Sequence, residues 1–275
     1  MISLVRGHYI DQIIQLSEQE LEKILKAVKP PAALIGGWAV HFHVDDGFRK
    51  DQGREYIGSR DIDLGVRVNP SWKQNEIKKK AVGMTLKEIE KLGYTKARFG
   101  FEIHYHRETM NRLTEEEARE LPMHQIFSVS IDVLPDSEKL KNFEKAFGFH
   151  PPAEPLLEYV FEKKRAKALK NCVPWSLPDS IYIPNPEVLA AMKIRSFPDR
   201  EKGYKRVKDL ADLHALLWYT ESYEKIRNNL RKLISNERFD KLENSLNIEI
   251  FESTADLLQV ETDLIRNTVN RLFEG

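Results

Sequence analysis

The chain has few of the features that mark a membrane protein or a protein of an oxidising compartment. It contains a single cysteine, Cys172, which excludes both a disulfide framework within the chain and a cysteine-based zinc site. No apolar run approaches the roughly 18 residues needed to span a bilayer. The first residues also lack the apolar core of a signal peptide. We therefore expect a cytoplasmic protein with no membrane partner.

The chain also has no net charge, because its 43 basic residues balance its 43 acidic residues. Composition therefore gives no indication of a nucleic-acid or membrane partner. A length of 275 residues allows one large domain or two modest ones. The predicted order of helices and strands is therefore used to distinguish one domain from two.

The first half of the chain mixes strand and helix patterns. Ser17 is a candidate N-cap for a helix that ends at the prolines 30 and 31, and residues 32–35 form a short apolar run. A helix is expected to start at Trp38, and the polar segment 45–59 is expected to be a loop or lid. Further strands are predicted over 60–68, 97–108 and 124–135, with a helix over 77–92.

The second half of the chain is mainly helical. The proline-rich segment 149–155 is the best boundary candidate, so we predict a domain over 1–150 and a mainly helical domain over 151–275. Asn185 and Pro186 are typical of a helix start. Residues 160–210 contain 12 basic and 6 acidic residues. The run 162–170 is interpreted as a solvated helix face, or alternatively as part of a basic groove for RNA.

Two aspartates stand two residues apart in the predicted strand 60–68. Successive side chains of a strand alternate between its faces, so Asp61 and Asp63 point to the same side, while Ile62 and Leu64 point to the core. The strand 124–135 repeats this pattern. If the two strands are neighbours, Asp132 joins the first two aspartates on one face.

Three carboxylates on one face repel one another unless cations neutralise them. Hard divalent ions with oxygen ligands, Mg²⁺ or alternatively Mn²⁺, remove this conflict. Two such ions ~3.5–4 Å apart form the usual clamp for in-line phosphoryl or nucleotidyl transfer. Gly36 and Gly37 lie between a predicted strand and a predicted helix, where the backbone can approach a phosphate closely. Together these motifs predict a site for a nucleoside triphosphate and two metal ions.

The motifs GGWAV, SRDIDL and IDV resemble those of the nucleotidyltransferase fold superfamily, the polymerase-beta-like group. The AbiEii-type toxin branch of that superfamily carries a helix with a lysine and then a K-D-x-x-D-like segment. Here these are VLAAMKIRSF, with Lys193, and KDLAD, with Lys208, Asp209 and Asp212. The resemblance covers roughly residues 34–217. It implies an α/β (α+β) fold, with a mixed sheet flanked by helices and followed by a mainly helical domain.

The resemblance also implies an activity, the transfer of a nucleoside monophosphate from an NTP to the hydroxyl of an acceptor such as tRNA or a protein. It further implies a toxin or phage-defence role with a cognate antitoxin. A small-molecule acceptor and a non-catalytic nucleotide- or RNA-binding protein are the alternatives. The implied catalytic residues are Asp61, Asp63, Asp132, Lys193 and Asp209, and the implied nucleotide-binding residues are Gly36, Gly37, Ser59, Arg60 and Lys193.

Other interpretations of these residues stay open. Lys193 could be a solvated lysine, and Asp209 and Asp212 could form ion pairs with it rather than act in catalysis. His104 and His106 share a strand face, at a spacing that can bind zinc. No third zinc ligand is evident in the sequence, so we expect these two histidines to be ordinary surface or core residues.

Overall fold

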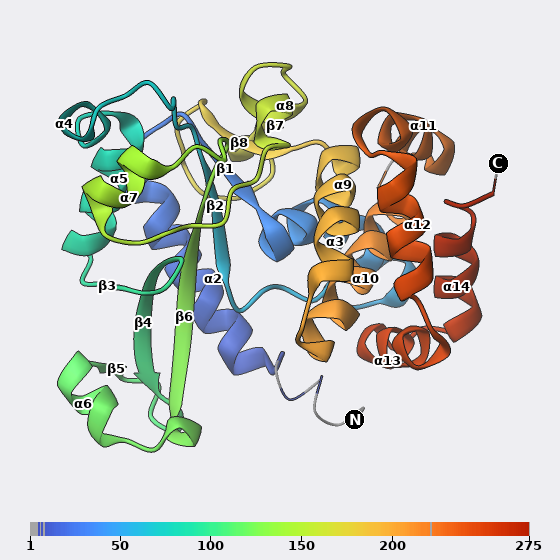
Figure 1. Cartoon of the computed structure of the whole chain (residues 1–275). Helices are drawn as coiled ribbons and strands as arrows, with labels where there is room; N and C mark the ends of the chain where they lie inside the picture. Colours follow the sequence, from blue (N-terminus) through green and yellow to red (C-terminus); the bar gives the residue numbers. More distant parts are fainter. Residues whose placement is uncertain (1–4, 6, 8, 221, 275) are drawn as a thin grey trace. The chain divides into compact units, whose positions relative to one another are not determined.

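A mixed β-sheet organises one of the two units into which the chain folds (Figure 1). The structure is a computed structural model and describes residues 5, 7, 9–220 and 222–274. The sheet unit contains residues 11–38 and 59–183, and the helical unit contains residues 1–10, 39–58 and 184–275. This division differs from the predicted boundary near residue 150. The reason is that β8 (Ile181–Pro184) pairs with β1 (Ala32–Ile35), which keeps the chain beyond residue 150 in the sheet unit.

The strand order of the sheet is β3-β4-β6-β2-β1-β8-β7, and β5 pairs with β4. β2 runs parallel to β6 and β1 runs parallel to β8, whereas the pairs β1–β2, β4–β6 and β3–β4 are antiparallel. The predicted mixed sheet is therefore confirmed. The other strands are β2 (Ile62–Val66), β3 (Thr95–Lys96), β4 (Gly100–His106), β5 (Arg112–Leu113), β6 (Ile126–Pro135) and β7 (Ala166–Ala168).

The two faces of β6 differ in burial along the whole strand. Its side chains alternate between half-buried and buried, as the alternating sequence predicts. β4 alternates in the same way. One face of this part of the sheet is therefore apolar core and the other is polar. The buried residues of β6 are Phe127, Val129, Ile131, Val133 and Pro135, and those facing the other way include Ser128, Ser130 and Asp132.

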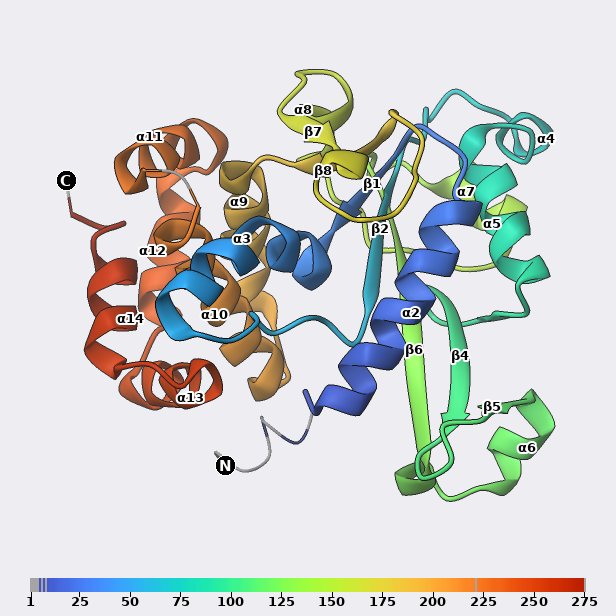
Figure 2. The same cartoon turned by 180° about the vertical axis from the view of Figure 1, so that it is seen from behind.

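Helix α2 (Asp11–Ala27) packs against β6 and against α5 (Ala81–Lys91), and Figure 2 shows it lying across the sheet. It buries Leu21, Ile24 and Leu25 at helical spacing, so its apolar stripe forms part of the core. The remaining helices of the sheet unit are α4 (Gln74–Ile77), α6 (Glu115–Glu120), α7 (Lys141–Phe147) and α8 (Leu157–Phe161), with short 3-10 turns η1 (Met123–Gln125) and η2 (Leu169–Asn171).

Three segments differ from their predicted secondary structure. Helix α3 (Gly36–Gln52) continues through residues 45–52, so the predicted loop or lid shrinks to 53–59. The predicted helix 77–92 is divided into α4 and α5. The basic run 162–170 is not a helix face, because α8 ends at Phe161 and the chain continues into β7. The basic side chains therefore do not form one helical stripe.

The helical unit is centred on α10 (Gly203–Trp218), which is buried without interruption from Val207 to Leu217 and packs against α9, α13 and α14. Helix α9 begins after the N-cap position Asn185 with Pro186 at its first position, as predicted. In the part of the chain that the structure describes, no helix is both long and apolar enough to cross a membrane. The other elements are α9 (Pro186–Ser196), η3 (Phe197–Asp199), α11 (Tyr223–Leu233), α12 (Asn236–Ser245), α13 (Ile248–Leu258) and α14 (Thr262–Asn270).

Candidate functional site

Asp63 and Asp132 are direct neighbours on the polar face of the sheet. They are paired positions of the parallel strands β2 and β6, and paired residues of parallel strands point to the same face. Both side chains are half-buried, whereas Ile62 and Ile131, which precede them, are buried. The two aspartate-bearing strands are neighbours, which was the condition for Asp132 to share a face with the other aspartates.

Asp61 lies one residue before β2, at a bend, and is half-buried. Its position is fixed by α2, because Ser17 Oγ donates a hydrogen bond of 3.2 Å to the carbonyl oxygen of Arg60. Trp38 Nε1 in turn donates to Ser17 Oγ at 3.1 Å. The predicted capping role of Ser17 is wrong, because the residue lies inside α2 and is fully buried. Its hydroxyl instead connects three segments around the aspartate-bearing strand.

Gly36 supports the carboxylate of Asp63. Its φ angle is +67°, a conformation that residues with a side chain rarely adopt. A Cβ atom at this position would lie 1.8 Å from Asp63 Oδ2 and 2.6 Å from Asp63 Cγ. The carboxylate therefore lies against the backbone where β1 passes into α3. Gly37 is buried in the first turn of that helix. The phosphate contacts of Gly36, Gly37, Ser59 and Arg60 stay predictions.

Asp132 also has a glycine as a neighbour. Gly100 on β4 is its antiparallel partner, and a Cβ atom there would lie 2.0 Å from the carbonyl oxygen of Ile131. The backbones of β4 and β6 thus approach too closely for a side chain at position 100. Asp132 is therefore flanked by Asp63 on β2 and by Gly100, which has no side chain, on β4.

The donor atoms of this carboxylate pair suit a hard divalent cation, because Mg²⁺ and Mn²⁺ prefer carboxylate oxygens. Two of the three predicted ligands, Asp63 and Asp132, are neighbours in the sheet. Across the described residues, no group of three or more His, Cys, Asp or Glu side chains is arranged to hold a metal ion. The contribution of Asp61 to a metal site stays a prediction.

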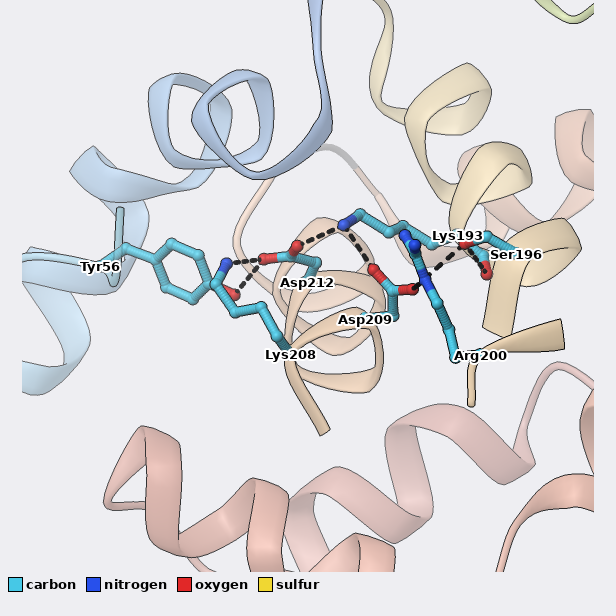
Figure 3. Close-up of polar contacts among 7 residues, drawn as sticks. All are labelled: Tyr56, Lys193, Ser196, Arg200, Lys208, Asp209 and Asp212. Carbon is cyan, nitrogen blue, oxygen red and sulfur yellow. Dashed lines mark hydrogen bonds and ion pairs between the residues drawn. The ribbon is translucent and has the colours of Figure 1, made fainter. Parts of the chain in front are cut away.

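The helical unit contains the other predicted site residues in a buried charged network (Figure 3). Lys193 Nζ on α9 lies 2.7 Å from Asp209 Oδ1 and 2.7 Å from Asp212 Oδ2 on α10. Asp209 Oδ2 also accepts hydrogen bonds from Arg200 Nε at 2.8 Å and from Ser196 Oγ at 3.2 Å. The ion-pair interpretation of these residues therefore describes the structure, and their part in catalysis stays a prediction.

The protonation states follow from this pairing. Burial works against the charged form of Lys193, but Asp209 and Asp212 outweigh it and raise the pKa of the lysine. Burial alone would raise the pKa of Asp209, yet the charges of Lys193 and Arg200 lower it to about 2. Lys193 and Asp209 are therefore ionised near neutral pH. Such a network is costly to break, because removal of one partner leaves a buried charge uncompensated.

Two further residues belong to the network, Lys208, which the sequence indicates only as part of the KDLAD motif, and Tyr56, which the sequence interpretation missed together with Ser196 and Arg200. The hydroxyl of Tyr56 donates to Asp212 Oδ1 at 2.9 Å, and Lys208 Nζ lies 2.5 Å from the same oxygen (Figure 3). The spacing of Lys208 and Asp212 is an i,i+4 pair that the motif KDLAD already contains. Nothing local to Tyr56 indicates its role, because its partner lies 156 residues away.

The basic run 162–170 has mixed surroundings. Lys163 Nζ lies 3.3 Å from Glu158 Oε1, and Lys170 forms an ion pair with Asp179. The guanidinium of Arg165 lies over the ring of Tyr159. Three of the five basic side chains of this run thus have a partner close by, which weakens the interpretation as a phosphate-binding helix.

No known protein family and no curated protein sequence matches this chain. Among solved structures, the chain is similar to an antigenic nucleotidyltransferase-like protein from Paracoccidioides brasiliensis. The identity is 12%, the TM-score is 0.37, and the match covers 85% of this chain and 93% of the other.

Proposed function

We propose that the chain is a metal-dependent nucleotidyltransferase, with its catalytic carboxylates on the polar face of the sheet. The observation that carries the proposal is the pairing of Asp63 with Asp132 on adjacent parallel strands, with the Asp63 carboxylate against Gly36. Adjacent carboxylates repel each other, and a cation that both coordinate relieves this repulsion. A carboxylate pair beside a helix start is suited to a metal-bound phosphate.

In this proposal Asp63 and Asp132, with Asp61, would hold two magnesium ions, and the glycines at the start of α3 would bind the triphosphate. Bound magnesium would offset the charge of the leaving pyrophosphate and lower the pKa of the acceptor hydroxyl. A bond forms between the hydroxyl oxygen and the α-phosphorus while the bond to the β-phosphate oxygen breaks. Pyrophosphate leaves with that electron pair, and the hydroxyl proton passes to the carboxylate of Asp132.

The test compares Asp63→Asn and Asp132→Asn with Asp179→Asn, an exposed aspartate of the same unit. Each protein is incubated with α-labelled NTP and Mg²⁺, and label is sought in RNA, protein and small-molecule fractions. We expect at least a 100-fold loss of transfer in the first two variants and none in the control. Transfer at the wild-type rate by Asp63→Asn would refute the proposal.

Ligand binding gives a readout that does not depend on knowing the acceptor. Carboxylates alone form a weak open magnesium site, which the triphosphate completes. The rise in melting temperature with NTP and Mg²⁺ together should therefore exceed the sum of the separate rises. This excess should disappear in Asp63→Asn and persist in Asp179→Asn. Equal shifts from NTP with and without the metal would contradict metal dependence.

A toxin role is part of the proposal only through the sequence resemblance. Induced expression of the wild-type chain should then arrest bacterial growth, and the arrest should require the carboxylates. Growth is measured for wild type, Asp132→Asn and Asp179→Asn at matched protein levels. Arrest by Asp132→Asn as complete as that by wild type would argue against a toxic transferase activity.

A further inference from the structure

The polar face that carries Asp63 and Asp132 also contains a cavity of about 630 Å³. Its floor is formed by strands β4 and β6, and α6 and η1 contribute to its wall. Ser128 of this floor lies on the same strand and the same face as Asp132, four residues away. At about 3.3 Å per residue this separation is roughly 13 Å. Arg60, which immediately precedes Asp61, also lines the cavity.

The floor presents a connected row of hydrogen-bonding groups. His104 and Ser128 are paired positions of β4 and β6, and His104 Nδ1 lies 2.8 Å from Ser128 Oγ. The other ring nitrogen of His104 lies 3.6 Å from Glu102 Oε1. A hydroxyl, an imidazole and a carboxylate in a row offer donors and acceptors that match the hydroxyl groups of a ligand.

The rim of the cavity does not resemble a phosphate-binding surface. Three basic and two acidic side chains line the cavity, so its charge is nearly balanced. Arg119 is paired with Glu115 at 2.7 Å, and Lys96 lies 3.3 Å from Glu90. A nucleic-acid backbone is bound through an excess of lysine and arginine, which this surface lacks.

The wall adds apolar contact area. Ala118 of α6 and Met123 of η1 line the cavity beside its floor, Ile126 lies in the floor itself at the start of β6, and Met123 is 91% exposed. Apolar side chains next to polar ones suit a ring that carries both hydroxyl and carbon–hydrogen groups. The volume lies within the usual range for sites that hold small molecules.

We propose that this cavity binds the acceptor of the transferase, and that the acceptor is a small hydroxylated molecule of about two rings. One end of such a molecule lies in the cavity, and the other extends along β6 toward Asp132, which lies roughly 13 Å from Ser128. The proposal rests on the proposed function. It names the acceptor class and gives Glu102, His104 and Ser128 the role of holding the acceptor.

The experiment uses saturation-transfer NMR of the full chain with maltose, trehalose and chitobiose as probes. Ala118→Trp fills the cavity, and Glu102→Gln removes the floor carboxylate without changing its shape. Glu116→Trp places the same bulky side chain on α6 at a position that does not line the cavity. We expect at least one disaccharide to bind wild type and Glu116→Trp, with binding at least tenfold weaker in the other two variants.

Three results would overturn the proposal. The first is that none of the three disaccharides binds to the wild-type chain. The second is that Ala118→Trp and wild type bind a disaccharide equally well. The third is that Ala118→Trp, but not Glu116→Trp, loses tenfold in affinity for tRNA. The excess thermal shift with NTP and Mg²⁺ is measured on the same proteins and should be unchanged in all of them. A missing excess in wild type would contradict the proposed function, whereas loss of disaccharide binding alone contradicts only the acceptor assignment.

Discussion

Replacement of Gly36 by alanine should displace the carboxylate of Asp63. The new Cβ atom would meet Asp63 Oδ2 at 1.8 Å, which no rotation of a methyl group relieves. The positive φ of +67° adds a backbone cost of about 1–2 kcal/mol for any residue with a Cβ. Overpacking against the carboxylate adds roughly 1–3 kcal/mol. Gly36→Ala should therefore destabilise the chain by about 2–5 kcal/mol.

Gly148→Ala is the matched control, because it separates the backbone cost from the clash. Gly148 lies in the same unit and has a φ of +82°, and no atom of the described residues lies within 4 Å of an added Cβ. Its replacement should cost only the backbone term of about 1–2 kcal/mol. Urea denaturation followed by circular dichroism gives both free energies of unfolding. The difference between the two variants isolates the contact with Asp63.

A double-mutant cycle tests the contact directly. In an Asp63→Gly background the carboxylate and the Cβ atom at 2.9 Å are both gone, so Gly36→Ala should lose its overpacking cost and show a coupling free energy of about 1–3 kcal/mol. In the wild-type background Gly36→Ala should also abolish the excess thermal shift with NTP and Mg²⁺. A coupling below about 0.5 kcal/mol, with equal destabilisation by Gly36→Ala and Gly148→Ala, would refute the placement of Asp63 against Gly36.

Three further predictions concern buried polar groups. Ser17→Ala removes the hydrogen bond to the carbonyl of Arg60 and should cost about 1–3 kcal/mol in urea denaturation; a neutral result would mean that the hydroxyl does not hold this segment. Asp209→Asn should lower the free energy of unfolding by about 3–5 kcal/mol, because the buried Lys193 then has only one carboxylate partner. The exposed Asp199→Asn should leave the free energy of unfolding unchanged, and equal effects of the two substitutions would contradict this prediction. Among the residues that the structure describes, neither ring nitrogen of His214 has a hydrogen-bond partner, and burial lowers the pKa of His214 from 6.5 to about 4. The unfolded chain therefore binds this proton first as the pH falls, and about 3 kcal/mol of stability should be lost between pH 6.5 and pH 4. His214→Leu should flatten that part of the stability profile, and an unchanged profile would assign the loss to other groups.

The sequence predicts the strand pair that carries the carboxylates because that information is local. Alternation of polar and apolar residues over 126–135 specifies which face of β6 is buried, and the structure has this pattern in full. The pairing of Asp63 with Asp132 needs more than alternation, because their strands are separated by about sixty residues. The sequence does not predict the register of β2 and β6, which the structure shows. It depends on how the two strands and the core beneath them pack.

The incorrect predictions share a physical cause, which is that tertiary contacts override short-range signals. A serine before a glutamate three residues on indicates a cap, but Ser17 is held inside α2 by hydrogen bonds to segments 21 and 43 residues away. The polar residues 45–52 favour a loop, yet α3 continues through them. The basic run 162–170 has helical composition but continues from α8 into a strand at the sheet edge.

The polar face of β6 contains an internal comparison that bears on the role of Asp132. Ser128 and Ser130 occupy equivalent positions on the same strand, half-buried and facing the same way. Asp132 differs from these two serines in its charge, which places a second carboxylate beside Asp63. A cation that both carboxylates coordinate turns their repulsion into shared coordination, which is the role that the proposed function gives to Asp132.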